Sequence, residues 1–184
     1  MSATRLAWPP VLVLPGLGNS GPAHWQSRWE HTHPTFRRVQ QREWDHPDCA
    51  EWVDTLDVAV RDCAEPPLLI AHSSACCMVA RWAAQHALLA RGALLVAPSD
   101  SEAPSYPPGP TGFRPMPLDK LDFPAIVVAS SDDPYVSIQR AREFAQSWGA
   151  QIVEIGARGH INSDSGLGDW PEGLMLAREL ALLD

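Results

Sequence analysis

Basic residues are scarce in this chain. It has 14 Lys and Arg residues against 22 Asp and Glu residues, which gives a formal net charge of −8. Phosphate backbones and anionic membrane surfaces repel a protein with this balance. The only basic clusters, Arg37-Arg38 and Arg140 to Arg142, are too short to form a nucleic-acid-binding stripe. We therefore predict no nucleic-acid partner.

Long apolar runs are also missing. No stretch approaches the roughly 20 apolar residues that a membrane-spanning helix needs. Residues 1–10 lack the apolar segment of a signal peptide. The sequence thus predicts a protein that does not associate with membranes and that resides in the cytoplasm.

Cysteine is too sparse and too irregularly spaced to form a disulfide or zinc framework. The chain has four cysteines and no C-x-x-C motif: Cys49, Cys63, Cys76 and Cys77. A disulfide between the neighbours Cys76 and Cys77 would be strained, since bridged Cα atoms usually lie further apart than adjacent ones. We expect buried free thiols in a reducing compartment, and we predict neither a metal site nor a cofactor.

Apolar runs of four to six residues alternate with amphipathic segments along the 184 residues. The runs predict buried strands and the amphipathic segments predict helices. The expected strands are 11–14, 36–39, 68–71, 92–97, 125–129 and 151–155, and the expected helices are 22–30, 49–63, 74–90, 137–148 and 169–183. This alternation is typical of a parallel sheet covered by helices on both faces. We predict one α/β domain over residues 1–184, with about six mainly parallel strands.

One segment differs in texture. Residues 98–118 hold seven prolines, which exclude helix and central strand there. Too little chain follows for a second full domain. We therefore interpret residues 98–123 as a proline-rich excursion from the core, and loops of this length are often functional.

The expected strand 68–71 leads directly into Ala71-His72-Ser73-Ser74-Ala75, and a helix follows at once. A strand–serine–helix turn is the context of a nucleophile elbow, whose usual pattern is G-x-S-x-G. Alanines replace both glycines here. The pattern favours Ser73 as nucleophile, with the backbone N–H of Ser74 facing the oxyanion. Ser74 as nucleophile, or both serines as simple helix caps, are the alternatives.

A serine nucleophile needs a base and an acid that orients it, in the chain order Ser, Asp, His. Asp132 and Asp133 follow the strand 125–129, and His160 lies in a glycine-bracketed loop after the last strand. Carboxyl ends of parallel strands meet at one edge of the sheet. We therefore predict that Ser73, Asp133 and His160 converge there. Asp132 is the alternative acid, and Asp164 is a weaker one.

The first strand ends in Gly16-Leu17-Gly18-Asn19-Ser20-Gly21, which fits two functions. As a literal G-x-G-x-x-G, with Glu43 further on, it indicates a dinucleotide site. In a hydrolase the same loop supplies the second oxyanion N–H, which we assign to Leu17. The hydrolase interpretation is favoured because it also explains the three strand-end residues.

Four segments together resemble the RBBP9/YdeN-type small serine hydrolases: Pro15 to Gly21 with His24-Trp25, Ala71 to Ser74, Ser130 to Tyr135, and Gly159 to Asn162. The stretch Ser165 to Gly173 resembles the tail of their bacterial members. The resemblance implies an α/β-hydrolase fold without a large cap domain. It also implies that Ser73 is the nucleophile, Asp133 the acid and His160 the base.

These observations predict a serine hydrolase that cleaves a carboxylic ester, thioester or amide of a small molecule through an acyl-enzyme. We expect Gly16, Gly18, Trp25 and Trp170 to contribute to substrate binding, with tryptophans and the proline-rich loop forming an apolar acyl pocket. The alternative for most of the tryptophans is a place in the core. A hydrolase-fold binding protein with little catalysis is the competing function, motivated by the alanines at the elbow. No protein partner is predicted.

Overall fold

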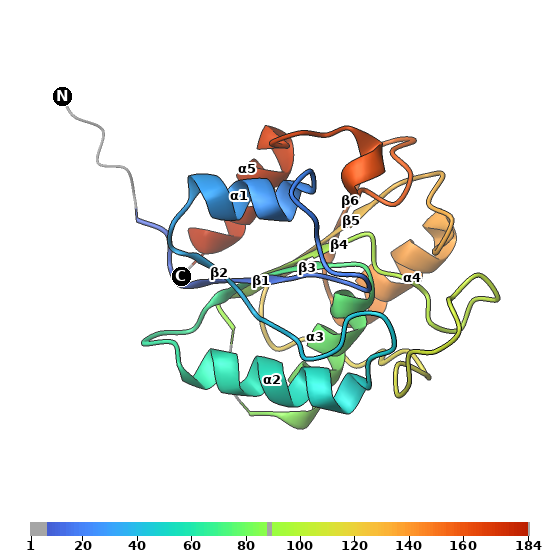
Figure 1. The fold of residues 1–184 in the computed structure, drawn as a ribbon, viewed down its shortest axis with the longest axis horizontal. Helices are drawn as coiled ribbons and strands as arrows, with labels where there is room; N and C mark the ends of the chain where they lie inside the picture. The colour runs from blue at the N-terminus through green and yellow to red at the C-terminus, as the bar shows by residue number, and fades with distance from the viewer. Residues whose placement is uncertain (1–6, 88–89, 184) are drawn as a thin grey trace.

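The computed structural model describes residues 7–87 and 90–183, and Figure 1 shows their arrangement. Six strands form one sheet: β1 (Val11–Leu14), β2 (Phe36–Arg38), β3 (Leu68–His72), β4 (Gly92–Val96), β5 (Ala125–Ala129) and β6 (Gln151–Glu154). Their order is β2-β1-β3-β4-β5-β6, and every pair is parallel. The predicted parallel α/β sheet is confirmed.

Helices cover both faces of this sheet. In Figure 1, α1 (Trp25–Thr32) and α5 (Pro171–Ala181) lie on one side. On the other side are α2 (Cys49–Arg61), α3 (Ser74–Gln85) and α4 (Ile138–Trp148), and a short 3-10 turn spans Ser163–Ser165. Alternate strand residues face opposite layers, so Leu12 packs in the cluster of α2, α3 and α4, while Val13 packs in that of α1 and α5.

Local sequence sets most helix boundaries. Asp48 caps α2 by accepting from the N–H groups of Ala50 and Glu51. Helix α4 ends at Gly149, whose left-handed backbone (φ 67°) suits glycine. Pro171 occupies the first turn of α5, where its missing N–H is harmless.

The helix predicted over residues 74–90 is shorter in the structure. Helix α3 ends at Gln85, and His86 has an extended backbone (φ −122°) with its ring 3.1 Å from the carboxylate of Asp57. Residues 88 and 89 lie outside the described part of the chain, as do residues 1–6 of the N-terminal stretch in which no signal peptide is expected.

The proline-rich excursion packs against the core. Between β4 and β5 the chain buries Tyr106, Phe113, Met116 and Leu121 in the layer of α2 and α3. The buried Cys77 thiol contacts the Phe113 carbonyl at 3.4 Å. The segment is thus part of the folded core, and residues of its first half line the cavity beside Ser73.

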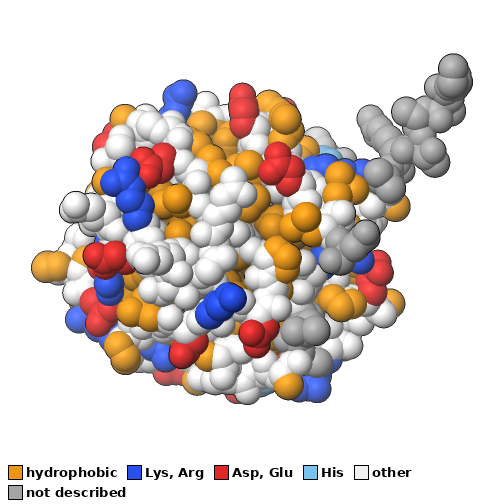
Figure 2. All heavy atoms as spheres, turned by 180° about the vertical axis from the view of Figure 1, so that it is seen from behind, with side chains coloured by type: hydrophobic (Ala, Val, Ile, Leu, Met, Phe, Trp, Pro, Cys, Tyr) orange, Lys and Arg blue, Asp and Glu red, His pale blue; other side chains and the backbone are white. Residues whose placement is uncertain are grey.

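Charged side chains are spread over the surface. On the face in Figure 2, basic and acidic side chains of the described residues are interspersed rather than gathered by sign. Within residues 7–87 and 90–183, no helix has both the length and the apolar character to cross a membrane.

Candidate active site

Ser73 is the single residue between β3 and α3, and its backbone is strained. Its backbone angles, φ 61° and ψ −127°, lie in a region that residues other than glycine rarely adopt. Such a conformation costs about 1–3 kcal/mol and persists only where neighbours impose it. The Ser73 N–H donates to the Val96 carbonyl at 2.9 Å, and the Ser73 carbonyl accepts from Cys76. The sheet and the helix therefore hold the turn from both sides.

The residues around this turn explain its tolerance for alanine. Ala71 and Ala75, which replace the usual glycines, are both fully buried, so their methyl groups are part of the core. The close approach occurs instead at Gly16. A Cβ on Gly16 would lie 2.7 Å from the Ser73 Cβ and 2.9 Å from the His72 carbonyl oxygen. The first glycine loop thus packs directly on the elbow.

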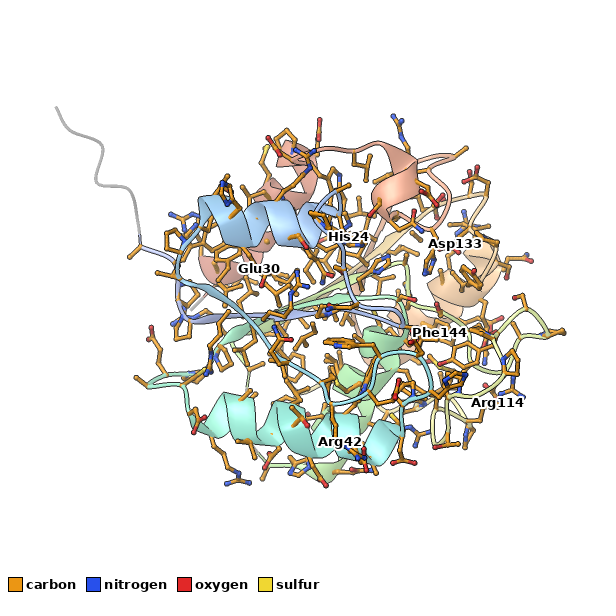
Figure 3. The ribbon with its side chains drawn as sticks, viewed as in Figure 1. His24, Glu30, Arg42, Arg114, Asp133 and Phe144 are labelled. Carbon is orange, nitrogen blue, oxygen red and sulfur yellow. The ribbon has the colours of Figure 1, made fainter. Side chains whose placement is uncertain are left out.

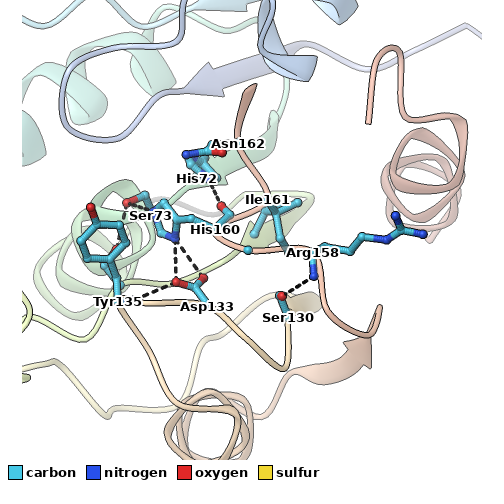
Figure 4. A network of polar contacts seen from close by, with 12 residues as sticks. His72, Ser73, Ser130, Asp133, Tyr135, Arg158, His160, Ile161 and Asn162 are labelled. Atoms are coloured by element: carbon cyan, nitrogen blue, oxygen red, sulfur yellow. Dashed lines mark hydrogen bonds and ion pairs between the residues drawn. The ribbon is translucent and has the colours of Figure 1, made fainter. Parts of the chain in front are cut away.

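The structure brings the three predicted residues into one hydrogen-bonded chain (Figure 4). The Nε2 atom of His160 lies 2.8 Å from the Ser73 hydroxyl oxygen, and Nδ1 lies 2.9 Å from an Asp133 carboxylate oxygen. Asp133 also accepts from the Tyr135 N–H, and its side chain is fully buried. Because a carboxylate only accepts, Nδ1 carries the imidazole proton, and Nε2 is free to accept from Ser73.

The alternative residues have other partners. The Asp132 carboxylate accepts from the Gly159 N–H at 2.7 Å and from the Ser130 hydroxyl at 2.8 Å. These hydrogen bonds lower the pKa of Asp132, and the one from Ser130 has the larger effect. The Ser74 hydroxyl pairs with the Tyr106 hydroxyl at 3.0 Å rather than with an imidazole. Asp132 therefore ties the His160 loop to the β5 loop, while Asp133 contacts the ring.

Two buried rings hold the backbone around His160. The Nε2–H of His72 donates to the His160 carbonyl at 2.9 Å, and the indole N–H of Trp25 donates to the Ile161 carbonyl at 2.8 Å. Ile161 has a positive φ of 50°, so this turn is strained as well. Burial, followed by the neighbouring His160 and His24, holds the pKa of His72 well below its ordinary value. His72 is therefore a neutral donor.

A cavity of about 340 Å³ opens in front of Ser73. Both predicted oxyanion donors, Leu17 and Ser74, line it. The Ser74 N–H is the first of α3, where N–H groups have no partner within the helix. Most of the other walls are polar: Asn19, His24, Ser99, Tyr106, Tyr135, Asn162, Ser163 and Asp164.

The residues predicted to bind substrate lie elsewhere. Trp25 and Trp170 are 1% and 3% exposed, with ring centroids 5.0 Å apart in the layer of α1 and α5, and they do not line the cavity. Both are core residues, so the prediction that they wall an acyl pocket is wrong. Gly16 and Gly18 are also absent from the lining. Gly16 packs behind Ser73, and the Gly18 N–H donates to the Trp44 carbonyl.

The dinucleotide interpretation of the glycine loop finds no support in these contacts. One Glu43 oxygen accepts from the N–H groups of Asp45 and His46 in its own turn. The loop itself is packed on Ser73.

No cluster of three or more metal-ligating side chains occurs among the residues that the structure describes.

Sequence reasoning missed His24. It caps α1, where its Nδ1 accepts from the Gln26 N–H at 3.2 Å, and it lines the cavity. In Figure 3 it lies at the start of α1, at the same end of the sheet as Asp133. Burial, and then electrostatic interaction with Arg38 and His160, lowers the pKa of His24 to about 4. The neutral ring carries its proton on Nε2, which has no hydrogen-bond partner among the described residues.

Sequence reasoning also missed Ser99. Its hydroxyl lies 2.9 Å from that of Ser73. Ser99 comes three residues after the end of β4, and this strand-end position is the sequence signal that could have found it.

Comparison with known proteins places this geometry among hydrolases. A family model described as serine hydrolase matches residues 11–179. A structure described as a YdeN-like hydrolase from Pectobacterium atrosepticum is 32% identical, with a TM-score of 0.84 over 95% of this chain and 91% of that one. The ydeN gene product of B. subtilis is 21% identical, with a TM-score of 0.78 over 94% and 98% of the two chains.

More distant structures share the fold alone. A monoacylglycerol lipase from Paleococcus ferrophilus is 12% identical, with a TM-score of 0.69 over 95% of this chain and 96% of that one. A comparison with curated proteins gave no match.

Proposed function

Since the chain belongs to the serine hydrolase family of α/β hydrolases, we propose that it cleaves carboxylic esters of small molecules through an acyl-enzyme on Ser73. Thioesters and amides present the same carbonyl to the same nucleophile. One observation carries this proposal: the continuous chain of hydrogen bonds from the Asp133 carboxylate through His160 to the Ser73 hydroxyl.

In the first step Ser73 attacks the carbonyl carbon while Nε2 of His160 takes the hydroxyl proton. Asp133 then faces an imidazolium, whose charge its buried carboxylate stabilises. The proton passes from Nε2 to the leaving oxygen, and the alcohol departs. Water repeats the sequence on the acyl-enzyme, with His160 as base, and releases the acid.

The backbone N–H groups of Leu17 and Ser74 hold the oxyanion in both steps. Both residues line the cavity beside Ser73. Each donor at such a site typically contributes about 10²–10³ in rate.

The walls of the cavity favour a small, uncharged, polar substrate. A volume of about 340 Å³ is at the low end for small-molecule sites. Among the described residues the lining includes Asp164 and no Lys or Arg, so an anionic ester meets no counter-charge from them.

A fluorophosphonate probe and a series of p-nitrophenyl esters of increasing acyl length test this function. Wild-type protein should label and should hydrolyse the short esters fastest, whereas Ser73→Ala should not label and His160→Ala should do both far more slowly. If folded wild-type protein neither labels nor turns over any ester, the chain is a binding protein on a hydrolase fold.

A further inference from the structure

Ser73 has a second polar neighbour besides His160. The Ser99 hydroxyl lies 2.9 Å from the Ser73 hydroxyl oxygen, and Ser99 is 4% exposed. It also lines the cavity in front of the nucleophile. A hydroxyl at hydrogen-bond distance from a reacting oxygen affects the chemistry of that oxygen, so its direction matters.

Counting protons fixes the direction of this hydrogen bond. Nδ1 of His160 donates to Asp133, so Nε2 of the neutral ring accepts, and the one hydroxyl proton of Ser73 goes to Nε2. Ser73 has no second proton to offer. The hydrogen bond between the two hydroxyls therefore has Ser99 as the donor and Ser73 as the acceptor.

The backbone before Ser99 is shaped to place it there. Ala97, the first residue after β4, has a positive φ of 48°, and its N–H donates to the Val128 carbonyl at 2.8 Å. Pro98 follows and restricts the chain further. This strained turn bends the segment back over the carboxyl ends of the strands, towards Ser73.

The backbone after Ser99 is anchored as well. The Asp100 N–H donates to the Tyr135 carbonyl at 3.0 Å, and the Asp100 carboxylate forms an ion pair with Arg140 of α4 at 3.1 Å. Both partners are largely buried. Ser99 is thus held by fixed backbone on each side.

From this geometry we propose that Ser99 is a further catalytic residue of this site, acting as a hydrogen-bond donor to the nucleophilic oxygen. The proposal rests on the proposed function. The donor holds the Ser73 oxygen in line with Nε2 of His160 before attack. As the proton of Ser73 moves to His160, negative charge grows on the oxygen before the new C–O bond is complete, and the Ser99 hydroxyl stabilises it.

The same hydrogen bond acts again in deacylation. When water has added to the acyl-enzyme, the bond between the carbonyl carbon and the Ser73 oxygen breaks, and that oxygen recovers its proton from His160. Charge appears on it once more, and Ser99 is again the donor. The Ser99 proton stays on Ser99 throughout. Because Ser99 acts on the nucleophile, its loss should lower kcat and leave KM nearly unchanged.

Ser99→Ala tests this role, with Ser101→Ala as the matched control. Ser101 is a buried serine two residues away whose hydroxyl donates to the Phe113 carbonyl at 2.7 Å, outside the cavity. A hydrogen bond to a developing charge predicts a fall of about tenfold or more in fluorophosphonate labelling rate and in kcat for Ser99→Ala. Ser101→Ala should label at the wild-type rate.

Ser99→Cys separates the hydrogen bond from packing, because a thiol is similar in size and a weak donor. Ser99→Cys should label about tenfold or more slowly than the wild type. This expectation can be tested even if Ser99→Ala does not fold. Wild-type rates in a folded Ser99→Ala or Ser99→Cys, with Ser73→Ala unlabelled, would overturn the role of Ser99 and leave the hydrolase intact. No labelling of the wild type would instead remove the proposed function.

Discussion

Replacing Gly16 with alanine probes the contact between the first glycine loop and the nucleophile elbow. The new Cβ would lie 2.7 Å from the Ser73 Cβ and 2.9 Å from the His72 carbonyl oxygen. Atoms do not approach this closely, so either the loop moves away or the strained Ser73 turn changes. Overpacking of this kind costs about 1–3 kcal/mol.

The elbow and the loop carry the nucleophile and the proposed Leu17 donor, so the displacement should act on the reaction. If most of the cost falls on the attacking geometry, kcat/KM should drop by about 10-fold to 100-fold. The assay is hydrolysis of p-nitrophenyl acetate together with urea unfolding, which separates loss of activity from loss of fold.

Two other glycines of the same loop give the controls. A Cβ on Gly21 meets nothing within 4 Å, so Gly21→Ala should unfold as the wild type does; because Gly21 lines the cavity, it is a control for stability alone. A Cβ on Gly18 also meets nothing, but its φ of 73° strains any side chain, so Gly18→Ala should lose about 1 kcal/mol of stability with little change in kcat. If Gly16→Ala matches Gly21→Ala in urea unfolding and Gly18→Ala in kcat, the argument from close packing is wrong.

Two further predictions follow from the carboxylates and from His24. Asp133→Asn should lower kcat about a thousandfold or more, because the amide oxygen would stay with the Tyr135 N–H and the amide NH2 would then donate to Nδ1 of His160 and favour the wrong tautomer. Asp132→Ala should lower kcat less than tenfold, because Asp132 only ties two loops together, and equal losses in ester hydrolysis would contradict this division. The pKa of His24 is about 4 in the folded protein, so its ring stays neutral there, whereas the unfolded chain binds a proton on this histidine below pH 6.5. The free energy of unfolding should therefore fall as pH drops from 6.5 to 4, by about 3 kcal/mol at the lower end. His24→Asn keeps the helix cap without the titration, so urea unfolding at pH 7, 5.5 and 4.5 should show a shallower decline than in the wild type, and an identical decline would exclude His24 as the source.

The sequence predicted the sheet well because its strands are short, unbroken apolar runs. In a parallel sheet the carboxyl ends of the strands share one edge, so Ser73, Asp133 and His160 were expected near one another from strand ends and chain order alone. The strand–serine–helix context similarly pointed to the elbow. These inferences need only the order of elements.

Inferences about side-chain direction were less successful, since direction depends on packing between layers. Trp25 and Trp170 follow motifs that face the site, yet their rings turn into the layer between α1 and α5. His24 lacks a strand-end position, so the order of elements does not mark it, whereas the cap on α1 turns it into the cavity. Ser99 opens a segment that the prolines marked only as a loop. Its approach to Ser73 depends on the turn at Ala97 and on the ion pair of Asp100, neither of which the sequence displays.

The three rings behind the nucleophile show how burial divides the work among similar side chains. The His72 ring lies 4.8 Å from that of His24 and 4.9 Å from that of His160. Only His160 has a carboxylate on its ring, and burial without a counter-charge lowers the pKa of the other two. A proton on either would repel the imidazolium that forms when Ser73 attacks. Their neutrality therefore leaves His160, paired with Asp133, as the one ring of the three suited to hold the transferred proton.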